Sequence, residues 1–404
     1  MARGFDALPP GPVGGAVSGG SDSYALLLLA AAWAETAGRR LTVATVDHNL
    51  RPESRAEADA VAAFAAAKNL SHRTLTWEEP PAGNLQDAAR RARYRLLGDW
   101  ARDGGLGAVL LGHTLDDQAE TVLQRLVRGS GVDGLSAMAP LHRREGVLWA
   151  RPLLCLRRAD LRAMLSRMAV TWQEDPSNDD TRFQRVQLRH AGENLDAIGL
   201  TAERLAATAD RMALARDALE HLAAETAARA VTADALGYLR IDTGTLRLAP
   251  LETQLRLLAA GLIWVTGVAY RPRLSTLKPA LAAALSPGFR ATTLHGAILA
   301  DDKGALLVTR EPGRTMGPVR AGALWDQRWT TPPRPGAHLR AMTKRELAEA
   351  GWKASGHPYL ACRSVPGLFE NQALLAAPFA NPLKGCHFML ARPPEAFFNS
   401  LTTR

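Results

Sequence analysis

Cysteine is scarce in this sequence, with three residues among 404: Cys155, Cys362 and Cys386. Their wide spacing provides neither a disulfide framework nor a Cys-x-x-Cys metal or redox pair, so a reducing environment is expected. No run of residues approaches the roughly 18 apolar positions of a membrane span. Residues 1–17 lack the apolar segment of a secretory signal. These absences predict a cytoplasmic protein that does not enter a membrane.

The composition that is present is typical of a globular protein. Hydrophobic residues make up 47% of the chain and charged residues 22%, which argues against disorder. A length of 404 residues predicts two or three domains. The formal net charge of +9 is compatible with a polyanionic partner such as nucleic acid, although charge alone does not identify a substrate.

Short apolar strands alternate with helical segments over the first 150 residues, which predicts an α/β domain with a Rossmann-like parallel sheet and helices on both faces. The expected strands are 13–17, 41–46, 73–77 and 108–111, and the expected helices are 23–36, 55–68, 85–101 and 116–128. Later elements are expected to be helices at 201–231 and 252–265 and strands at 292–299 and 305–308. We therefore expect a catalytic domain over 1–191, a mostly helical domain over 192–312 and a small C-terminal domain over 313–404.

A Ser-Gly-Gly-Ser-Asp-Ser loop joins the first expected strand directly to the first helix. Glycines let the backbone approach an anion, and successive N–H groups at the positive end of a helix bind it. The aspartate would repel phosphates unless a cation intervened, so Mg²⁺ is expected beside it. The chain has no Walker-type nucleotide loop, and a polar turn that only caps a helix is the alternative. The loop residues are Ser18, Gly19, Gly20, Ser21, Asp22 and Ser23.

This loop resembles that of the N-type ATP pyrophosphatases, the PP-loop family, which adenylate a carbonyl oxygen and release pyrophosphate. Within that family, the motifs that follow resemble those of the tRNA(Ile)-lysidine synthetases. They occur in one order between residues 14 and 189, at 47–51, 84–94, 111–121, 128–131, 151–154 and 174–178. The resemblance implies ATP as co-substrate, contacted by the loop, Asp47 and His113, with Mg²⁺ held at Asp22. It implies L-lysine and the CAU-anticodon isoleucine tRNA as partners, and lysidine at the wobble cytidine as product.

Asp117 and Glu120 are three residues apart and therefore share one helix face. The resemblance assigns them to lysine binding, and with Asp22 they form the predicted catalytic set. A solvated acidic cap of the helix would explain Asp116 and Asp117 but not Glu120. The ε-amine of lysine has a pKa of about 10.4, and a nearby carboxylate raises it. We therefore expect the pair to recruit and orient lysine, and one member to accept its proton as the C–N bond forms.

Two groups of arginines are candidates for tRNA binding, because guanidinium groups form bidentate bonds with phosphates. Arg90 and Arg93 share a helix face, and a second stripe consists of Arg182, Arg185 and Arg189. A solvated basic face is an equally open explanation for the stripe. Arg185 is followed by Val186, where the resembling family commonly has asparagine. The region over 192–312, and also the C-terminal segment, are expected to contact tRNA.

Two alternatives stay open. A PP-loop tRNA thiolase, of the 2-thiocytidine or 2-thiouridine type, would carry the same loop, but the scarcity of cysteine argues against sulfur transfer. A nucleotide-binding regulator or passive RNA binder would need no acidic pair facing a polyanion. The sequence is compatible with a homodimer without specifying one, and it does not indicate how isoleucine tRNA is distinguished from methionine tRNA.

Overall fold

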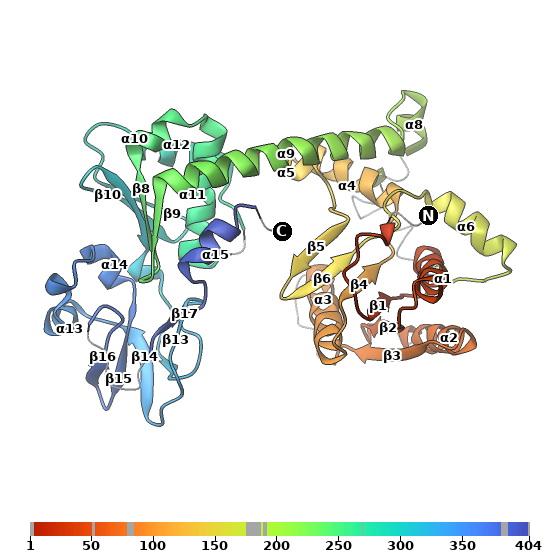
Figure 1. Cartoon of the computed structure of the whole chain (residues 1–404), viewed down its shortest axis with the longest axis horizontal. Coiled ribbons are helices and arrows are strands. Elements are labelled where there is room, and N and C mark those ends of the chain that lie inside the picture. The colour runs from red at the N-terminus through yellow and green to blue at the C-terminus, as the bar shows by residue number, and fades with distance from the viewer. Residues whose placement is uncertain are drawn as a thin grey trace. The chain divides into compact units, whose positions relative to one another are not determined.

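The computed structural model (Figure 1) describes residues 4–50, 53–78, 85–174, 187–188, 192–268, 270–380 and 387–402. The chain forms two compact units, one up to residue 216 and the other from residue 217. Helix α9 (Ala202–Ala230) contains the division between them. Among the described helices, none has the length and apolar character needed to cross a membrane.

The first unit contains a six-stranded sheet in the order β3-β2-β1-β4-β6-β5. All neighbouring strands are parallel except β5, which pairs with β6 as an antiparallel hairpin at the edge. The sequence did not indicate this hairpin. The strands are β1 (Val13–Ala16), β2 (Leu41–Asp47), β3 (Ser71–Thr76), β4 (Ala108–Leu111), β5 (Leu141–Arg144) and β6 (Val147–Ala150).

Helices cover both faces of this sheet, because successive strand residues point to opposite sides. Leu110 belongs to the core beneath α1, α2 and α6, whereas Val109 and Leu111 belong to the core beneath α3. The predicted parallel α/β domain is therefore confirmed. The helices of this unit before α9 are α1 (Ser21–Thr36), α2 (Ser54–Ala67), α3 (Leu85–Asp103), α4 (Leu115–Val127), α5 (Val132–Leu135), α6 (Arg158–Arg167) and α8 (Gly192–Ala197).

The second unit begins with a five-stranded antiparallel sheet in the order β7-β8-β11-β10-β9. The single strand predicted at 292–299 is wrong: His295 and Gly296 have positive φ values of 56° and 77° and form the turn between β9 and β10. The strands are β7 (Val231–Asp234), β8 (Tyr238–Asp242), β9 (Ala291–Leu294), β10 (Ala297–Asp302) and β11 (Ala305–Arg310). The helices packed with them are α10 (Thr243–Leu248), α11 (Leu251–Thr266), α12 (Leu274–Ala284) and α15 (Pro394–Asn399).

The rest of the second unit is built on a four-stranded sheet in the order β12-β14-β15-β16. Its core also contains Leu236 and Leu307 from the five-stranded part. The predicted boundary at residue 313 therefore falls within one compact unit, and the division into three domains stays a prediction. The elements are η3 (Pro312–Arg314), β12 (Val319–Arg320), β13 (Trp329–Thr330), β14 (Ala337–Ala341), α13 (Lys344–Glu349), η4 (Trp352–Ser355), α14 (Tyr359–Arg363), β15 (Pro366–Glu370), β16 (Ala373–Ala376) and β17 (Met389–Leu390).

Candidate active site

The loop between β1 and α1 has the geometry of an anion site. Gly19 adopts a φ of +92°, a conformation that favours glycine. The hydroxyl of Ser23 donates to the carbonyl of Gly20 at 2.8 Å and accepts from the N–H of Ser18 at 3.2 Å, which holds the turn closed. Within the described residues, the consecutive N–H groups of residues 19–22 have no protein acceptor. These donors lie at the positive end of a 16-residue helix, where an anion is stabilised.

A cavity of about 870 Å³ adjoins the loop at the carboxyl ends of β1 and β2. Ser18, Asp47 and His48 line it together with apolar side chains such as Val46 and Leu97. Its volume lies within the range of small-molecule sites, roughly 300–1,000 Å³. The loop and Asp47, both expected to contact ATP, therefore border one cavity at the sheet edge where ligands of parallel α/β sheets bind.

A second cavity of about 180 Å³ is lined by His113, Arg90, Arg93 and His48. His48 and Arg93 also line the larger cavity. Burial lowers the pKa of His48, and the nearby Arg93 lowers it further, so its imidazole is neutral at pH 7. Burial also lowers the pKa of Arg93, and no carboxylate of the described chain forms an ion pair with it. A half-buried cation at a cavity wall suits an anionic ligand.

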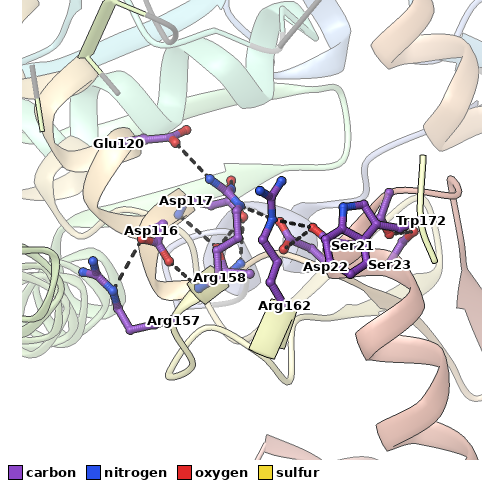
Figure 2. A network of polar contacts seen from close by, with 12 residues as sticks. Ser21, Asp22, Ser23, Asp116, Asp117, Glu120, Arg157, Arg158, Arg162 and Trp172 are labelled. Atoms are coloured by element: carbon purple, nitrogen blue, oxygen red, sulfur yellow. Dashed lines mark hydrogen bonds and ion pairs between the residues drawn. The ribbon is translucent and has the colours of Figure 1, made fainter. Parts of the chain in front are cut away.

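Three carboxylates meet around one guanidinium beside the loop (Figure 2). Asp22 lies on α1, Asp117 and Glu120 lie on α4, and we refer to the three as the acidic cluster. Arg158, the first residue of α6, donates from Nε to Asp22 at 2.8 Å and from Nη2 to Asp117 at 3.0 Å. Its Nη1 lies 3.6 Å from Glu120. The guanidinium thus joins the phosphate loop to the predicted lysine-binding pair.

Asp117 also has a structural role. Its Oδ2 accepts from the N–H of Thr114 at 2.7 Å and from the Thr114 hydroxyl at 2.9 Å, which closes a capping box at the start of α4. The interpretation of Asp117 as a helix cap is therefore correct for one of its oxygens. The charges are not solvated, however, because only 5% of Asp117 and 7% of Glu120 is exposed. Glu120 takes no part in the cap.

A second layer of polar contacts surrounds the acidic cluster. Asp116 accepts from the backbone N–H of Arg158 at 2.7 Å and lies 3.5 Å from Arg157. Arg162 of α6 donates to the Ser21 hydroxyl at 3.2 Å. These contacts fix the start of α6 against both α1 and α4, as Figure 2 shows.

Burial and charge shift the pKa values of Asp22 and Arg158 in the acidic cluster. Burial raises the pKa of Asp22, and Arg158 only partly opposes this rise. Burial lowers the pKa of Arg158, but Asp117 and Asp22 more than offset it, and the net shift is upward. Arg158 therefore stays protonated, and three carboxylates lie around its guanidinium. Carboxylates gathered in this way are suited to bind a cation.

The donor set fits a magnesium ion that comes with the nucleotide. No group of three or more His, Cys, Asp or Glu side chains in the described residues could hold a metal by itself. Mg²⁺ in nucleotide sites commonly takes one or two carboxylates together with phosphate oxygens. Asp22, in the first turn of α1 and next to the loop, offers the carboxylate of such a site.

The structure brings most of the predicted residues together. Ser18 of the loop and Asp47 line the larger cavity, His113 lines the smaller one, and the acidic cluster lies beside the loop. Arg182, Arg185 and Arg189 lie outside the described residues. Sequence reasoning missed Arg158, which lies four residues after the end of the expected motif at 151–154, because that position carries no periodic signal.

Comparison with known proteins identifies the family of the chain. Residues 10–193 match the PP-loop domain family. The chain is 41% identical to the tRNA(Ile)-lysidine synthase of Ruegeria pomeroyi, over 98% of this chain and 95% of that protein. This chain belongs to the tRNA(Ile)-lysidine synthase family. The synthase of Methylobacterium nodulans is 44% identical over 78% of this chain and 96% of its own length.

A solved structure shares a weaker likeness with the chain. The U34-tRNA thiolase of Methanococcus maripaludis has 16% sequence identity and a TM-score of 0.45, over 51% of this chain and 74% of that chain. A likeness at this level carries no functional argument. The family membership rests on the sequence relatives, which extend across both units.

Proposed function

We propose that this protein, in the cytoplasm, joins L-lysine to C2 of the wobble cytidine in the CAU-anticodon isoleucine tRNA. ATP adenylates the C2 carbonyl oxygen, which converts a poor leaving group into AMP and releases diphosphate. The lysine ε-amine then displaces AMP and forms lysidine. The near full-length similarity to tRNA(Ile)-lysidine synthases supports this reaction.

The observation that carries the proposal is the shared guanidinium of Arg158. One side chain contacts Asp22 of the phosphate loop and both members of the acidic pair on α4, at 2.8, 3.0 and 3.6 Å. An amine held by Asp117 and Glu120 would therefore lie close to a nucleotide held by the loop. Such proximity converts an encounter of separate molecules into a reaction within one complex.

Each part of the site has a distinct task in this reaction. The N–H groups of residues 19–22 hold the phosphates, and Asp22 would hold Mg²⁺, which would supply positive charge for the release of diphosphate. Asp117 and Glu120 bind and orient the ε-ammonium group. A cavity of about 110 Å³ beside Glu120, with Leu123 and Leu205 in its wall, offers apolar contact for the methylene stem of lysine. One carboxylate accepts the proton as the C–N bond forms.

The tRNA contacts are proposed for two sets of arginines. Arg90 is exposed above the ring of Tyr94, at 5.4 Å from its centroid, and Arg93 lines both cavities. Both can meet phosphates of the anticodon loop near the adenylation site. Arg182, Arg185 and Arg189 are proposed as further phosphate contacts on the ground of their spacing alone.

A labelled-substrate assay tests the function. The protein is incubated with Mg·ATP, labelled lysine and transcribed isoleucine tRNA, with methionine tRNA, which has the same anticodon, as the matched control. The expected result is label in the isoleucine tRNA only, with equal amounts of AMP and diphosphate. Modification that requires a sulfur donor and no lysine would instead support the thiolase. The described cysteines argue against that outcome, because Cys155 is exposed and Cys362 is buried in the other unit.

A further inference from the structure

We propose that Arg158 is an internal competitor of the lysine substrate. Its guanidinium occupies, in the resting protein, the position in the acidic cluster that the ε-ammonium of lysine takes during the reaction. This inference rests on the proposed function, because it assumes that Asp117 and Glu120 recognise lysine. It goes further in assigning Arg158 a role in deciding when lysine binds.

The hydrogen bonds of Asp117 carry the argument. Its Oδ2 is committed to the capping box, where it accepts from both the N–H and the hydroxyl of Thr114. Its Oδ1 accepts from Nη2 of Arg158 at 3.0 Å. An incoming ammonium can therefore reach Asp117 only through the oxygen that Arg158 already holds, unless it breaks the helix cap.

Burial makes simultaneous occupancy unfavourable. The side chains of Asp117 and Glu120 are 7% and 8% exposed, and that of Arg158 is 18% exposed. A guanidinium and an ammonium on the same buried carboxylates would repel each other with little screening by water. Lysine binding therefore requires the guanidinium of Arg158 to move away from at least Asp117 and Glu120.

The contact of Arg158 with Asp22 links this exchange to the nucleotide. It is the shortest of the three contacts, at 2.8 Å, and it comes from the phosphate loop. When Asp22 turns to Mg·ATP, Arg158 loses this partner, and the incoming triphosphate offers the guanidinium a new anion next to the loop. Mg·ATP should therefore favour lysine binding, and by linkage lysine should favour Mg·ATP to the same degree.

A binding experiment without tRNA tests the competition. L-lysine is titrated calorimetrically into the full chain at pH 8, for the wild type and for Arg158→Gln, with and without Mg²⁺ and a non-hydrolysable ATP analogue. If Arg158 vacates the cluster about a tenth of the time, it weakens apparent lysine binding about tenfold. Arg158→Gln should then bind lysine about tenfold more tightly without nucleotide, and the difference should shrink when the analogue is bound. An unchanged or weaker affinity in the folded variant would overturn the proposal, because an arginine that merely positions the carboxylates has that effect.

Two controls separate competition from a general effect of charge. Arg157→Gln removes the same charge from the neighbouring residue, whose guanidinium contacts Asp116 and Glu203 outside the acidic cluster. Competition predicts a clearly smaller gain in lysine affinity for this variant than for Arg158→Gln, and an equal gain would overturn the proposal. L-norleucine lacks the ε-ammonium, so no variant should bind it more tightly than the wild type does. Tighter binding of L-norleucine would overturn the proposal as well.

A second substitution keeps the test decisive if Arg158→Gln does not fold. Arg158→Lys retains a positive charge but replaces the fork with a single ammonium that reaches fewer carboxylates. Its lysine affinity should lie above that of the wild type, and an affinity at or below the wild-type level would overturn the proposal. If the wild type forms lysidine but neither Arg158 variant binds lysine more tightly, the competition alone is overturned and the proposed function stands. A wild type that binds no lysine and forms no lysidine overturns the proposed function, and the competition with it.

Discussion

Two arginines make different sets of contacts in the two units. In the first unit, the half-buried Arg158 faces three carboxylates. In the second unit, Arg310 pairs with the single carboxylate of Asp326 through two bonds of 2.9 and 3.0 Å. Two of its three remaining N–H groups donate to the carbonyls of Gly296 and Arg314. We expect the first arrangement to serve ligand binding and the second to stabilise the fold.

This difference follows from the energetics of buried charge. A buried, hydrogen-bonded ion pair gives its surroundings a fixed geometry, although it adds little net stability compared with apolar residues. Carboxylates that lie close together repel one another, and a cationic substrate or metal bound among them removes that repulsion. We therefore expect substitutions in the second unit to change unfolding and substitutions in the acidic cluster to change chemistry.

The largest expected effect is on the stability of the second unit. Asp326→Asn removes the counter-charge of Arg310 and also a favourable charge near the fully buried Arg328, whose pKa burial lowers to about 9. Asparagine tolerates the φ of +50° at this position. The free energy of unfolding should fall by about 3–5 kcal/mol, measured by denaturant titration. Arg345→Gln in the exposed pair Arg345–Glu349 is the control and should cost no more than about 1 kcal/mol.

The next-largest effect is on the activity of the acidic cluster in the first unit. Glu120→Gln keeps the shape of the side chain but removes a charge that holds lysine. The value of kcat/KM for lysine should fall about 100-fold, the equivalent of about 2.7 kcal/mol, while the thermal midpoint stays close to that of the wild type. Glu203→Gln, which changes an exposed carboxylate beside Arg157, should leave kcat/KM nearly unchanged. If Glu120→Gln lost activity while its lysine affinity stayed intact, Glu120 would serve proton transfer and not recruitment.

A matched pair of glycine substitutions tests the phosphate loop. Gly19→Ala places a side chain at a φ of +92° and within 2.7 Å of Oε1 of Gln173, so stability should fall by about 1–2 kcal/mol. Gly20 has a φ of −76°, and an added methyl group would meet no atom within 4 Å. Gly20→Ala should therefore preserve stability but weaken ATP binding, because the methyl group enters the space left for the anion. Equal ATP affinity in the wild type and Gly20→Ala would contradict the assignment of that space.

The smallest expected effect is a pH dependence at the cavity wall. The pKa of His48 is lowered in the folded protein, mainly by burial. The unfolded chain therefore takes up this proton first, and the stability that His48 contributes is full above its unfolded pKa of about 6.5 and is lost as the pH falls below it. Between pH 7.5 and 5.5, the thermal midpoint of His48→Gln should fall less than that of the wild type. His221→Gln on the exposed face of α9 should follow the wild type, and the same slope in both variants would refute the role of His48.

Local sequence patterns predicted most of the strands and helices of the first unit. Its four predicted strands and four predicted helices occur within a few residues of the expected bounds, because each is a run of apolar periodicity ended by a turn. The second unit was harder to predict. Its strands are short and pair through turns such as that at His295 and Gly296, and non-glycine residues with positive φ give no clear signal in a single sequence. The hairpin of β5 and β6 was also missed, because β5 is a half-exposed edge strand.

The sequence by itself determined the phosphate loop and its chemistry, because six consecutive residues between a strand and a helix contain all that an anion site needs. It also determined that Asp117 and Glu120 share a face, since helical spacing is local. Only the tertiary structure decided what these carboxylates contact. Arg158 lies 136 residues from Asp22 along the chain, and no periodicity extends over such a distance. The packing of α6 against α1 and α4 joins the two halves of the site, because only in the folded chain does one guanidinium reach all three carboxylates.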